Sequence, residues 1–361
     1  MIRTTSILLA ALVIGAGPAS AEGVVNVYNW SDYIDESVLE DFTKETGIEV
    51  RYDVFDSNEL LEAKLLAGSS GYDVVVPSAY FLARQIEAGV FDPLDKSKLE
   101  NFGNLWDEIL AQTDRYDAGA EHAIPYMWGT TGFGYVEEKI LERMPDAPVG
   151  SWDMIFDPEV AAKFADCGIH ILDAPADVMP VALHYLGKDP NSTNPDDLRA
   201  AADLLTSVRP YVQKFHSSEY INALANGDIC LAIGWSGDVL QARDRAAEAD
   251  NGITVKYVIP EEGTQMWFDM MAIPADAPNK ENAHTFLDFI MRPDVIAKAT
   301  NYVNYANGNE ASKELVDQGV LTDPAVYPPE EVQAKLFTTV ALPPRAQRVA
   351  TREWTRVKTG S

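Results

Sequence analysis

Short runs of β-branched and other apolar residues alternate along the chain with stretches in which apolar residues recur every three or four positions. The run over residues 24–28 predicts a buried strand, and residues 48–54 and 73–76 predict two more. A helix is predicted after the first strand, because four apolar residues fall on one of its faces: Ile34, Val38, Leu39 and Phe42. This alternation predicts an α/β fold in which helices flank the sheets.

A second set of strand and helix signals follows the glycine-dotted segment 129–134. It contains predicted extended segments over 169–172, 229–233, 254–259 and 266–273. Because 361 residues exceed what one hydrophobic core usually organises, the two sets predict two lobes with a hinged cleft between them. We expect an N-terminal lobe of residues 22–130 and 258–305 and a C-terminal lobe of residues 131–257 and 306–361.

The first 21 residues have the pattern of a signal peptide. Arg3 precedes an uncharged apolar stretch over 7–17, and Ala19, Ser20 and Ala21 match the small-residue cleavage pattern. No other window is apolar enough for a membrane-spanning helix, and no cysteine follows the cleavage site to carry a lipid. We expect cleavage after Ala21, export to the periplasm and no insertion into the membrane.

The chain carries 56 aspartates and glutamates against 28 lysines and arginines, a formal net charge of -28. Nucleic acid and anionic membranes repel such a chain, so neither is expected as a partner. A cationic ligand is compatible with this charge, although surface acid also keeps exported proteins soluble. The two cysteines, Cys167 and Cys230, are an even number in a chain predicted to be exported, which indicates one structural disulfide.

Tryptophans and aspartates recur together at or just after predicted strands. The three pairs are Trp30 with Asp32, Trp235 with Asp238, and Trp267 with Asp269. The members of the last pair lie two positions apart on a predicted strand and therefore on the same face of it. Ligands of open α/β sheets bind outside the carboxyl ends of the strands, so these residues form the candidate site.

A ring beside an acid is the pairing that an alkyl polyamine requires. Flat apolar walls suit its methylene chain, and carboxylates receive ammonium groups whose burial without a partner is costly. A ring face near a cation contributes about 0.5 to 2 kcal/mol, and a charged hydrogen bond about 1.5 to 3 kcal/mol. The alternatives are that each tryptophan is core and that certain polar residues cap helices: Ser31, Asp32, Ser236 and Asp238. The repetition of the pair favours a site for a polycation.

No catalytic or metal-binding motif is recognisable. The five histidines lack HExxH spacing, and the glycines at 68 and 71 lack the lysine of a phosphate-binding loop. Residues 234–237 do not form the GxSxG elbow of a serine hydrolase. A glycosidase-type carboxylate pair is the remaining catalytic alternative, since 56 acids bring some pair together by chance. We predict no enzyme activity, no metal and no cofactor.

Four stretches resemble the periplasmic polyamine-binding proteins of ABC transporters, most closely their putrescine-binding branch: VYNWSDYI at 27–34, YDVFDSN at 52–58, LGKDPNS at 186–192 and ANGDIC at 225–230. The resemblance implies a two-lobed type II periplasmic binding protein fold, with two mixed sheets flanked by helices, and supports the disulfide between Cys167 and Cys230. It also implies a monomer that captures spermidine, putrescine or both and delivers them to an inner-membrane permease. A polyamine sensor, or a binding protein for another organic cation, is the alternative.

The resemblance extends to the ligand contacts of the family. The matching positions are Trp30, Ser31, Asp32, Tyr33, Ser78, Tyr80, Asp177, Trp235, Asp238, Trp267, Asp269 and Tyr305. By this matching the three tryptophans wall the methylene chain. Asp238 and Asp269 hold one amine, and Asp32 and Asp177 serve the far end of the ligand.

Several positions bear on which polyamine is bound. Trp267 and Tyr80 resemble the spermidine-binding relatives, whereas the putrescine branch tends to have phenylalanine and a smaller residue there. Asp177 is one methylene shorter than the glutamate common at its position, so its contact with the ligand is expected to run through water. Ala174 lacks the acid of the spermidine-binding relatives. The resemblance therefore favours spermidine and leaves putrescine, or both, open.

Overall fold

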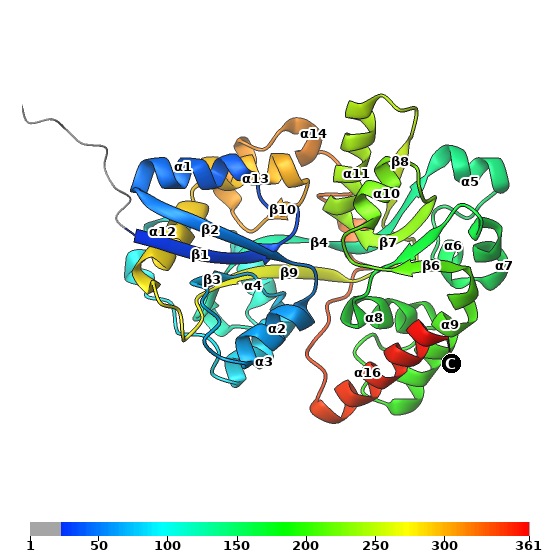
Figure 1. Cartoon of the computed structure of the whole chain (residues 1–361), viewed down its shortest axis with the longest axis horizontal. Helices are drawn as coiled ribbons and strands as arrows, with labels where there is room; N and C mark the ends of the chain where they lie inside the picture. Colours follow the sequence, from blue (N-terminus) through cyan, green and yellow to red (C-terminus); the bar gives the residue numbers. More distant parts are fainter. Residues whose placement is uncertain (1–22, 361) are drawn as a thin grey trace, which may run out of the picture.

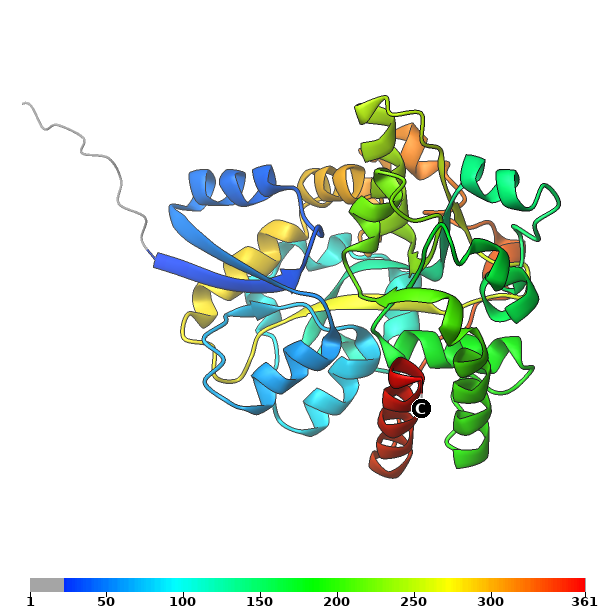
Figure 2. The same cartoon turned by 45° about the vertical axis from the view of Figure 1, so that its right-hand side comes forward.

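The computed structural model describes residues 23–360 and shows two lobes joined by strands that run through the middle of the molecule (Figure 1). Figure 2 shows from a second direction that each lobe has its own helices around its own strands. The predicted signal peptide and its cleavage after Ala21 lie outside the described residues. Within residues 23–360, no helix is both long and apolar enough to cross a membrane.

The first lobe is a mixed sheet with helices on both sides (Figure 1). Its strands are β1 (Gly23–Trp30), β2 (Ile48–Phe55), β3 (Val74–Val75), β9 (Met266–Ala272) and β10 (Ala306–Asn307). β1 pairs in parallel with β2 and β3, and β9 runs antiparallel to β3. Its helices are α1 (Glu36–Thr46), α2 (Asn58–Leu66), α3 (Ala79–Glu87), α4 (Asp107–Thr113), α12 (Lys280–Ile290), α13 (Pro293–Val303) and α14 (Gln318–Leu321).

Helix α1 forms where the apolar periodicity predicts it. Val38 and Phe42 are buried on one face. The side chain of Asp35 caps the first turn by accepting the N–H of Ser37 at 2.9 Å. Gly47 ends the helix in the left-handed region, with φ 75°, which costs a glycine little.

The second lobe is a smaller sheet enclosed by helices. Its strands are β5 (Ile169–Ile171), β6 (Val212–Phe215), β7 (Leu231–Trp235) and β8 (Val255–Val258). Its helices are α5 (Glu137–Arg143), α6 (Asp153–Phe156), α7 (Pro158–Ala161), α8 (Pro175–Tyr185), α9 (Pro195–Val208), α10 (Tyr220–Ala225), α11 (Ser236–Ala249) and α16 (Pro344–Thr359). A short helix, α15 (Glu330–Gln333), lies on the segment that leads back to this lobe.

Strand β4 (Ala123–Val136) belongs to both sheets, and all of its residues are buried. Its first half pairs with β9 and β10, and its second half pairs with β7 and β8. The main path of strands therefore runs β2-β1-β3-β9-β4-β7-β5-β6. The two predicted mixed sheets thus share one strand, which lies between the lobes.

Two separate hydrophobic cores accompany the two sheets. The first core contains Phe42 and Phe286, and the second contains Trp152 and Trp354. The sequence assigned residues 306–361 to the C-terminal lobe, but Ala306 and Val326 pack in the first core. The structure corrects this part of the assignment: the segment from β10 to about residue 326 lies with the first lobe, because β10 pairs with the first half of β4. The other domain boundaries stay predictions.

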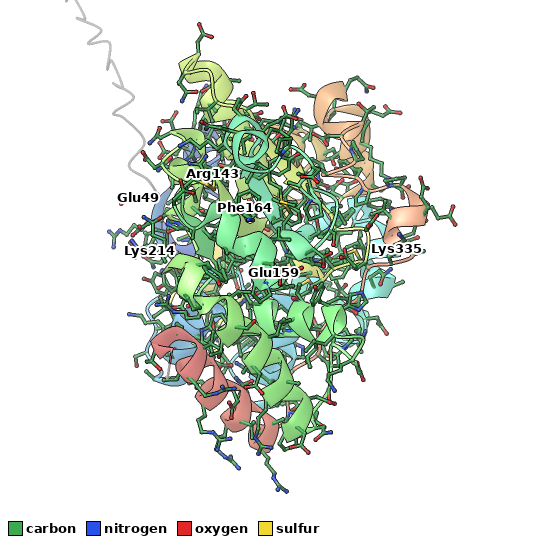
Figure 3. All side chains as sticks on the ribbon, turned by 90° about the vertical axis from the view of Figure 1, so that its right-hand side faces the viewer. Glu49, Arg143, Glu159, Phe164, Lys214 and Lys335 are labelled. Atoms are coloured by element: carbon green, nitrogen blue, oxygen red, sulfur yellow. A yellow bond between two sulfur atoms is a disulfide. The ribbon has the colours of Figure 1, made fainter. Side chains whose placement is uncertain are left out.

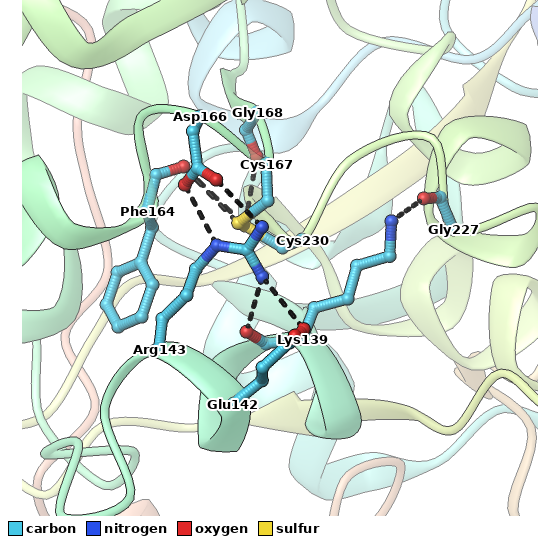
Figure 4. The surroundings of a disulfide bond; sticks show 9 residues. All are labelled: Lys139, Glu142, Arg143, Phe164, Asp166, Cys167, Gly168, Gly227 and Cys230. Atoms are coloured by element: carbon cyan, nitrogen blue, oxygen red, sulfur yellow. Dashed lines mark hydrogen bonds and ion pairs between the residues drawn. A yellow bond between two sulfur atoms is a disulfide. The ribbon is translucent and has the colours of Figure 1, made fainter.

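The predicted disulfide between Cys167 and Cys230 is present, with a Cα–Cα distance of 5.5 Å (Figure 4). It joins the segments that enter β5 and β7, two parallel neighbours in the second sheet. Figure 3 looks onto the end of this lobe, where Arg143, Glu159 and Lys214 are at the surface. Phe164, close to the disulfide in Figure 4, is fully buried. The disulfide therefore braces the second core.

Candidate functional site

A cavity of about 430 Å³ lies between the two lobes at the ends of the strands. Its lining consists of Trp30, Ser31, Tyr33, Asp56, Asn58, Ser78, Tyr80, Asp177, Ser217, Trp235, Asp238, Trp267, Asp269 and Tyr305. Every predicted ligand residue except Asp32 lines this cavity.

Asp269 lies on β9 and is 4% exposed. Its two carboxylate oxygens accept hydrogen bonds from different donors, Ser78 Oγ at 2.6 Å and the Tyr33 hydroxyl at 2.8 Å. Ser78 precedes α3 and Tyr33 follows β1, so three segments of the first lobe meet at this carboxylate. These bonds fix the orientation of the Asp269 side chain.

Asp238 lies in the first turn of α11 and is 6% exposed. The Tyr220 hydroxyl of the second lobe donates to one carboxylate oxygen at 2.7 Å, and the Tyr305 hydroxyl of the first lobe donates to the other at 2.7 Å. Asp238 is therefore held from both sides of the cleft.

Asp177 lies in the first turn of α8 and is 4% exposed. The Tyr80 hydroxyl lies 3.3 Å from one of its oxygens, and the indole N–H of Trp235 lies 3.4 Å from the other. These bonds are longer than those at Asp238 and Asp269, so the Asp177 carboxylate is less firmly held.

The three aspartates share an electrostatic environment that favours a cation. The lining of the cavity contains no lysine or arginine. Burial raises the pKa of Asp238, Asp269 and Asp177 to about 7 in each case, and the nearby Glu59 carboxylate adds to the rise at Asp177. A carboxylate accepts about four hydrogen bonds, so each one keeps free acceptor positions. A positively charged ligand would donate hydrogen bonds to these acceptors and lower the free-energy cost of ionising each aspartate.

Aromatic rings form the walls between the carboxylates. Trp30 and Trp235, from different lobes, have ring centroids 5.5 Å apart at an interplanar angle of 72°. Trp267 and Tyr305 are 5.4 Å apart at 61°. Trp30 is fixed by a hydrogen bond from its indole N–H to the carbonyl of Val76 at 2.9 Å. Trp30 and Trp267 are buried and Trp235 is partly buried, but all three line the cavity, so the core alternative does not exclude a role in binding.

The helix-capping alternative is wrong for the candidate residues. The side chain that caps α1 is Asp35, not Ser31 or Asp32. At the start of α11, neither Ser236 nor Asp238 makes a side-chain cap hydrogen bond. The carboxylate of Asp238 is directed instead to the two tyrosines that hold it.

Asp32 differs from the prediction. Its carboxylate pairs with the guanidinium of Arg245 on α11 at 2.6 Å and is not part of the cavity lining. The residue has φ 53°, in the left-handed region, and its carbonyl accepts a hydrogen bond from the Gln241 side chain at 3.2 Å. In this geometry Asp32 does not take its predicted role at the far end of the ligand, because its carboxylate already pairs with Arg245.

Three lining residues were missed: Asp56, Asn58 and Ser217. Asp56 and Asn58 directly follow β2, so the rule that strand ends carry the site would have found them. Ser217 follows β6, a strand that the apolar pattern did not predict because only Val212 in it is buried. Tyr220, which holds Asp238, was also missed and carries no signal beyond its place in α10.

The fold and the cavity together define a class of protein. Two lobes that share one strand and enclose a cavity lined by aromatic rings and carboxylates are typical of a solute-binding protein. A family model described as bacterial extracellular solute-binding protein matches residues 37–328. The chain belongs to this family.

Individual relatives extend the match to nearly the whole chain. The putrescine-binding periplasmic protein SpuD of Pseudomonas aeruginosa (strain UCBPP-PA14) is 54% identical over 356 residues, which cover 98% of this chain and 97% of that protein. The putrescine-binding periplasmic protein PotF of Escherichia coli (strain K12) is 52% identical over 354 residues, 97% of this chain and 96% of that protein. These relatives confirm the predicted resemblance to periplasmic polyamine-binding proteins.

A solved structure supports the fold. The spermidine/putrescine ABC transporter substrate-binding protein PotD of Streptococcus pneumoniae superposes with a TM-score of 0.74 at 29% identity, covering 94% of this chain and 99% of that chain. The predicted type II periplasmic binding protein fold is confirmed. Membership of a family of transporter substrate-binding proteins likewise confirms the prediction that this chain is not an enzyme.

Proposed function

We propose that this protein captures a polyamine in the periplasm and delivers it to the permease of an ABC transporter. The observation that carries the proposal is the cavity itself, in which three buried aspartates and three tryptophans occur together without a lysine or arginine. SpuD and PotF, which are named as putrescine-binding periplasmic proteins, support the same ligand class.

Buried charge in the cavity favours a cationic ligand. A carboxylate without a cationic partner is expensive to bury, so three in one cavity favour a ligand that brings several positive charges. A polyamine carries ammonium groups separated by methylene segments, and these segments suit the ring faces of Trp30, Trp235 and Trp267. A metal ion fits less well, since no cluster of histidine, cysteine or acidic ligands occurs among the described residues.

The role of each residue follows from its position. Asp238 and Asp269 hold one ammonium group, and Asp177 holds a second. Because Asp238 receives donors from both lobes, a ligand bound there stabilises the closed arrangement, which the permease then recognises. The protein acts as a monomer in this proposal, and spermidine and putrescine are the candidate ligands.

Isothermal titration calorimetry with putrescine, cadaverine, spermidine and spermine tests the proposal. We expect micromolar or tighter binding, about -8 kcal/mol, for at least one of the four. The Asp238→Asn, Asp269→Asn double variant should lose this binding, whereas Asp146→Asn, at an exposed position, should keep it. If none of the four polyamines binds, the proposed function is wrong. Undiminished binding by the double variant would instead refute the assigned site.

A further inference from the structure

Helix α11 of the second lobe lies beside α13 of the first lobe (Figure 1). Val239 and Ala242 of α11 pack in the second core, whereas Leu240 between them packs in the first. The side chain of Gln241 also reaches the first lobe, because its amide donates to the carbonyl of Val303 at 3.3 Å. Contacts between the lobes therefore continue along α11 beyond Asp238.

Two neighbouring charged residues of α11, Arg243 and Asp244, belong to a polar chain that crosses between the lobes. Arg243 Nη1 donates to Asp323 Oδ2 at 2.8 Å, and Arg243 Nε donates to Asp244 Oδ1 at 2.9 Å. The other carboxylate oxygen of Asp244 accepts a hydrogen bond from the Asn304 side chain at 2.9 Å. The chain thus begins on the first lobe at Asp323, passes through the second lobe and returns to the first lobe at Asn304.

The first-lobe members of this chain are fixed to their own lobe. Asn304 ends α13 in the left-handed region, with φ 58°, and is 4% exposed. Asp323 accepts the N–H of Ala325 at 2.9 Å, and Val326, three positions further on, packs in the first core. Because Arg243 and Asp244 belong to α11 of the other lobe, a movement that separates the lobes must break the chain.

The chain is separate from the ligand cavity. Of the described residues of α11, Asp238 lines the cavity, and the four members of the chain lie outside its lining. A contact that exists only when the lobes are closed, and that does not touch the ligand, favours closure to the same degree for every ligand. The side chains of Arg243 and Asp323 are 38% and 17% exposed, so water screens their attraction only in part.

We propose that the chain of Asp323, Arg243, Asp244 and Asn304, here called the α11 clasp, favours the closed arrangement of the lobes and so strengthens the binding of every polyamine equally. The inference rests on the proposed function, in which the ligand is held between closed lobes, and adds a determinant of affinity outside the cavity. Release of the ligand requires the lobes to open, and opening breaks the clasp.

The test uses Arg243→Gln, Asp323→Asn and the double variant. Asp323→Asn keeps a side-chain oxygen that can accept the Ala325 N–H. The matched control is Arg143→Gln, which breaks an ion pair with Asp166, at 2.8 Å, inside the second lobe. Calorimetry measures the dissociation constants of putrescine and spermidine. Small-angle X-ray scattering measures the radius of gyration of each ligand-free protein, and thermal unfolding checks that each variant is folded.

We expect each single substitution to raise the dissociation constants of putrescine and spermidine by the same factor, about fivefold. The double variant should lose no more affinity than the weaker-binding single variant, because both substitutions break the same ion pair. The ligand-free variants should be more open and have a larger radius of gyration than the unsubstituted protein. Arg143→Gln should change neither quantity.

A loss of affinity that differs between the two amines would place the effect inside the cavity and overturn the clasp. Unchanged dissociation constants together with an unchanged radius of gyration would also overturn it, and both results would leave the proposed function intact. An unsubstituted protein that binds neither amine would overturn the proposed function. The radius of gyration of the ligand-free proteins would then decide the clasp by itself, and an unchanged radius would overturn it.

Discussion

The hydroxyl of Tyr305 donates a hydrogen bond to Asp238 at 2.7 Å and thereby links the two lobes. Tyr305 packs in the first core, whereas Asp238 lies in the first turn of α11 in the second lobe. The other carboxylate oxygen of Asp238 accepts a hydrogen bond from the Tyr220 hydroxyl at 2.7 Å. Asp238 is thus an oriented, buried carboxylate at the boundary of the lobes, and the ligand is expected to bring its positive charge there.

Replacement of Asp238 by asparagine separates binding from stability. The variant keeps the shape of the side chain but loses the charge, so polyamine affinity should fall about 10- to 100-fold, as expected for one charged hydrogen bond of about 1.5 to 3 kcal/mol. The melting temperature of the ligand-free protein should rise, because a buried charge without a cation is removed. Calorimetry and thermal unfolding measure the two effects. A fall in both quantities would indicate misfolding and contradict the assigned role.

Ligand binding should depend on pH through the three cavity aspartates. Their pKa is raised from 3.8 to about 7, chiefly by burial. Between these values the folded state holds protons that the unfolded state has lost, so the free energy of unfolding of the ligand-free protein should fall as the pH rises from about 4 to about 7.

Polyamine affinity should change in the opposite direction, because the carboxylates must lose their protons to bind ammonium groups. We expect the dissociation constant to decrease between about pH 5.5 and pH 8, with protons released on binding in buffers of different ionisation enthalpy. Calorimetry across this range measures both effects. A dissociation constant that is independent of pH would contradict the proposed environment of Asp177, Asp238 and Asp269.

Asp32 offers a test of the corrected site. Its carboxylate pairs with Arg245, and the two side chains are 39% and 32% exposed, so the pair is worth at most about 1 kcal/mol. Asp32→Asn should therefore lower polyamine affinity less than about fivefold, far less than Asp238→Asn. A loss as large as that of Asp238→Asn would show that Asp32 contacts the ligand, as the sequence predicted.

Trp267 is expected to influence which polyamine is preferred. Its ring lies 5.4 Å from that of Tyr305 and forms one wall of the cavity. Trp267→Phe shortens this wall, so the preference should shift from spermidine toward putrescine by a few-fold, the effect of about 1 kcal/mol of ring contact. Competition of the two amines for the same sample measures the shift. An unchanged preference would refute this specificity argument.

Much of the fold could be predicted because burial follows periodicity. The alternating pattern of β1 and the apolar face of α1 depend on neighbouring residues, and both elements occur where the pattern indicates. The path of residues 306–326 could not be predicted in the same way. Pairing of β10 with Met127 and Trp128 depends on contacts about 180 positions away, which the local pattern does not contain.

The same distinction applies to the site. Trp267 and Asp269 were predicted from their spacing, because residues two apart on a strand share a face. The direction of the Asp32 side chain could not be predicted, since it depends on a backbone conformation with φ 53° and on Arg245, 213 positions away. Asp56 follows β2, which was predicted, so the strand-end rule could have found it, whereas Ser217 follows β6, whose apolar pattern is too weak to indicate a strand.

Native mass spectrometry of the protein purified gently from its bacterium tests the central claim most directly. We expect a complex whose added mass equals one polyamine, with spermidine as the expected species. The Asp238→Asn, Asp269→Asn double variant, purified alongside, should carry no such ligand. A bound molecule that contains no amine, or a protein that stays free of ligand after incubation with spermidine and putrescine, would contradict the claim.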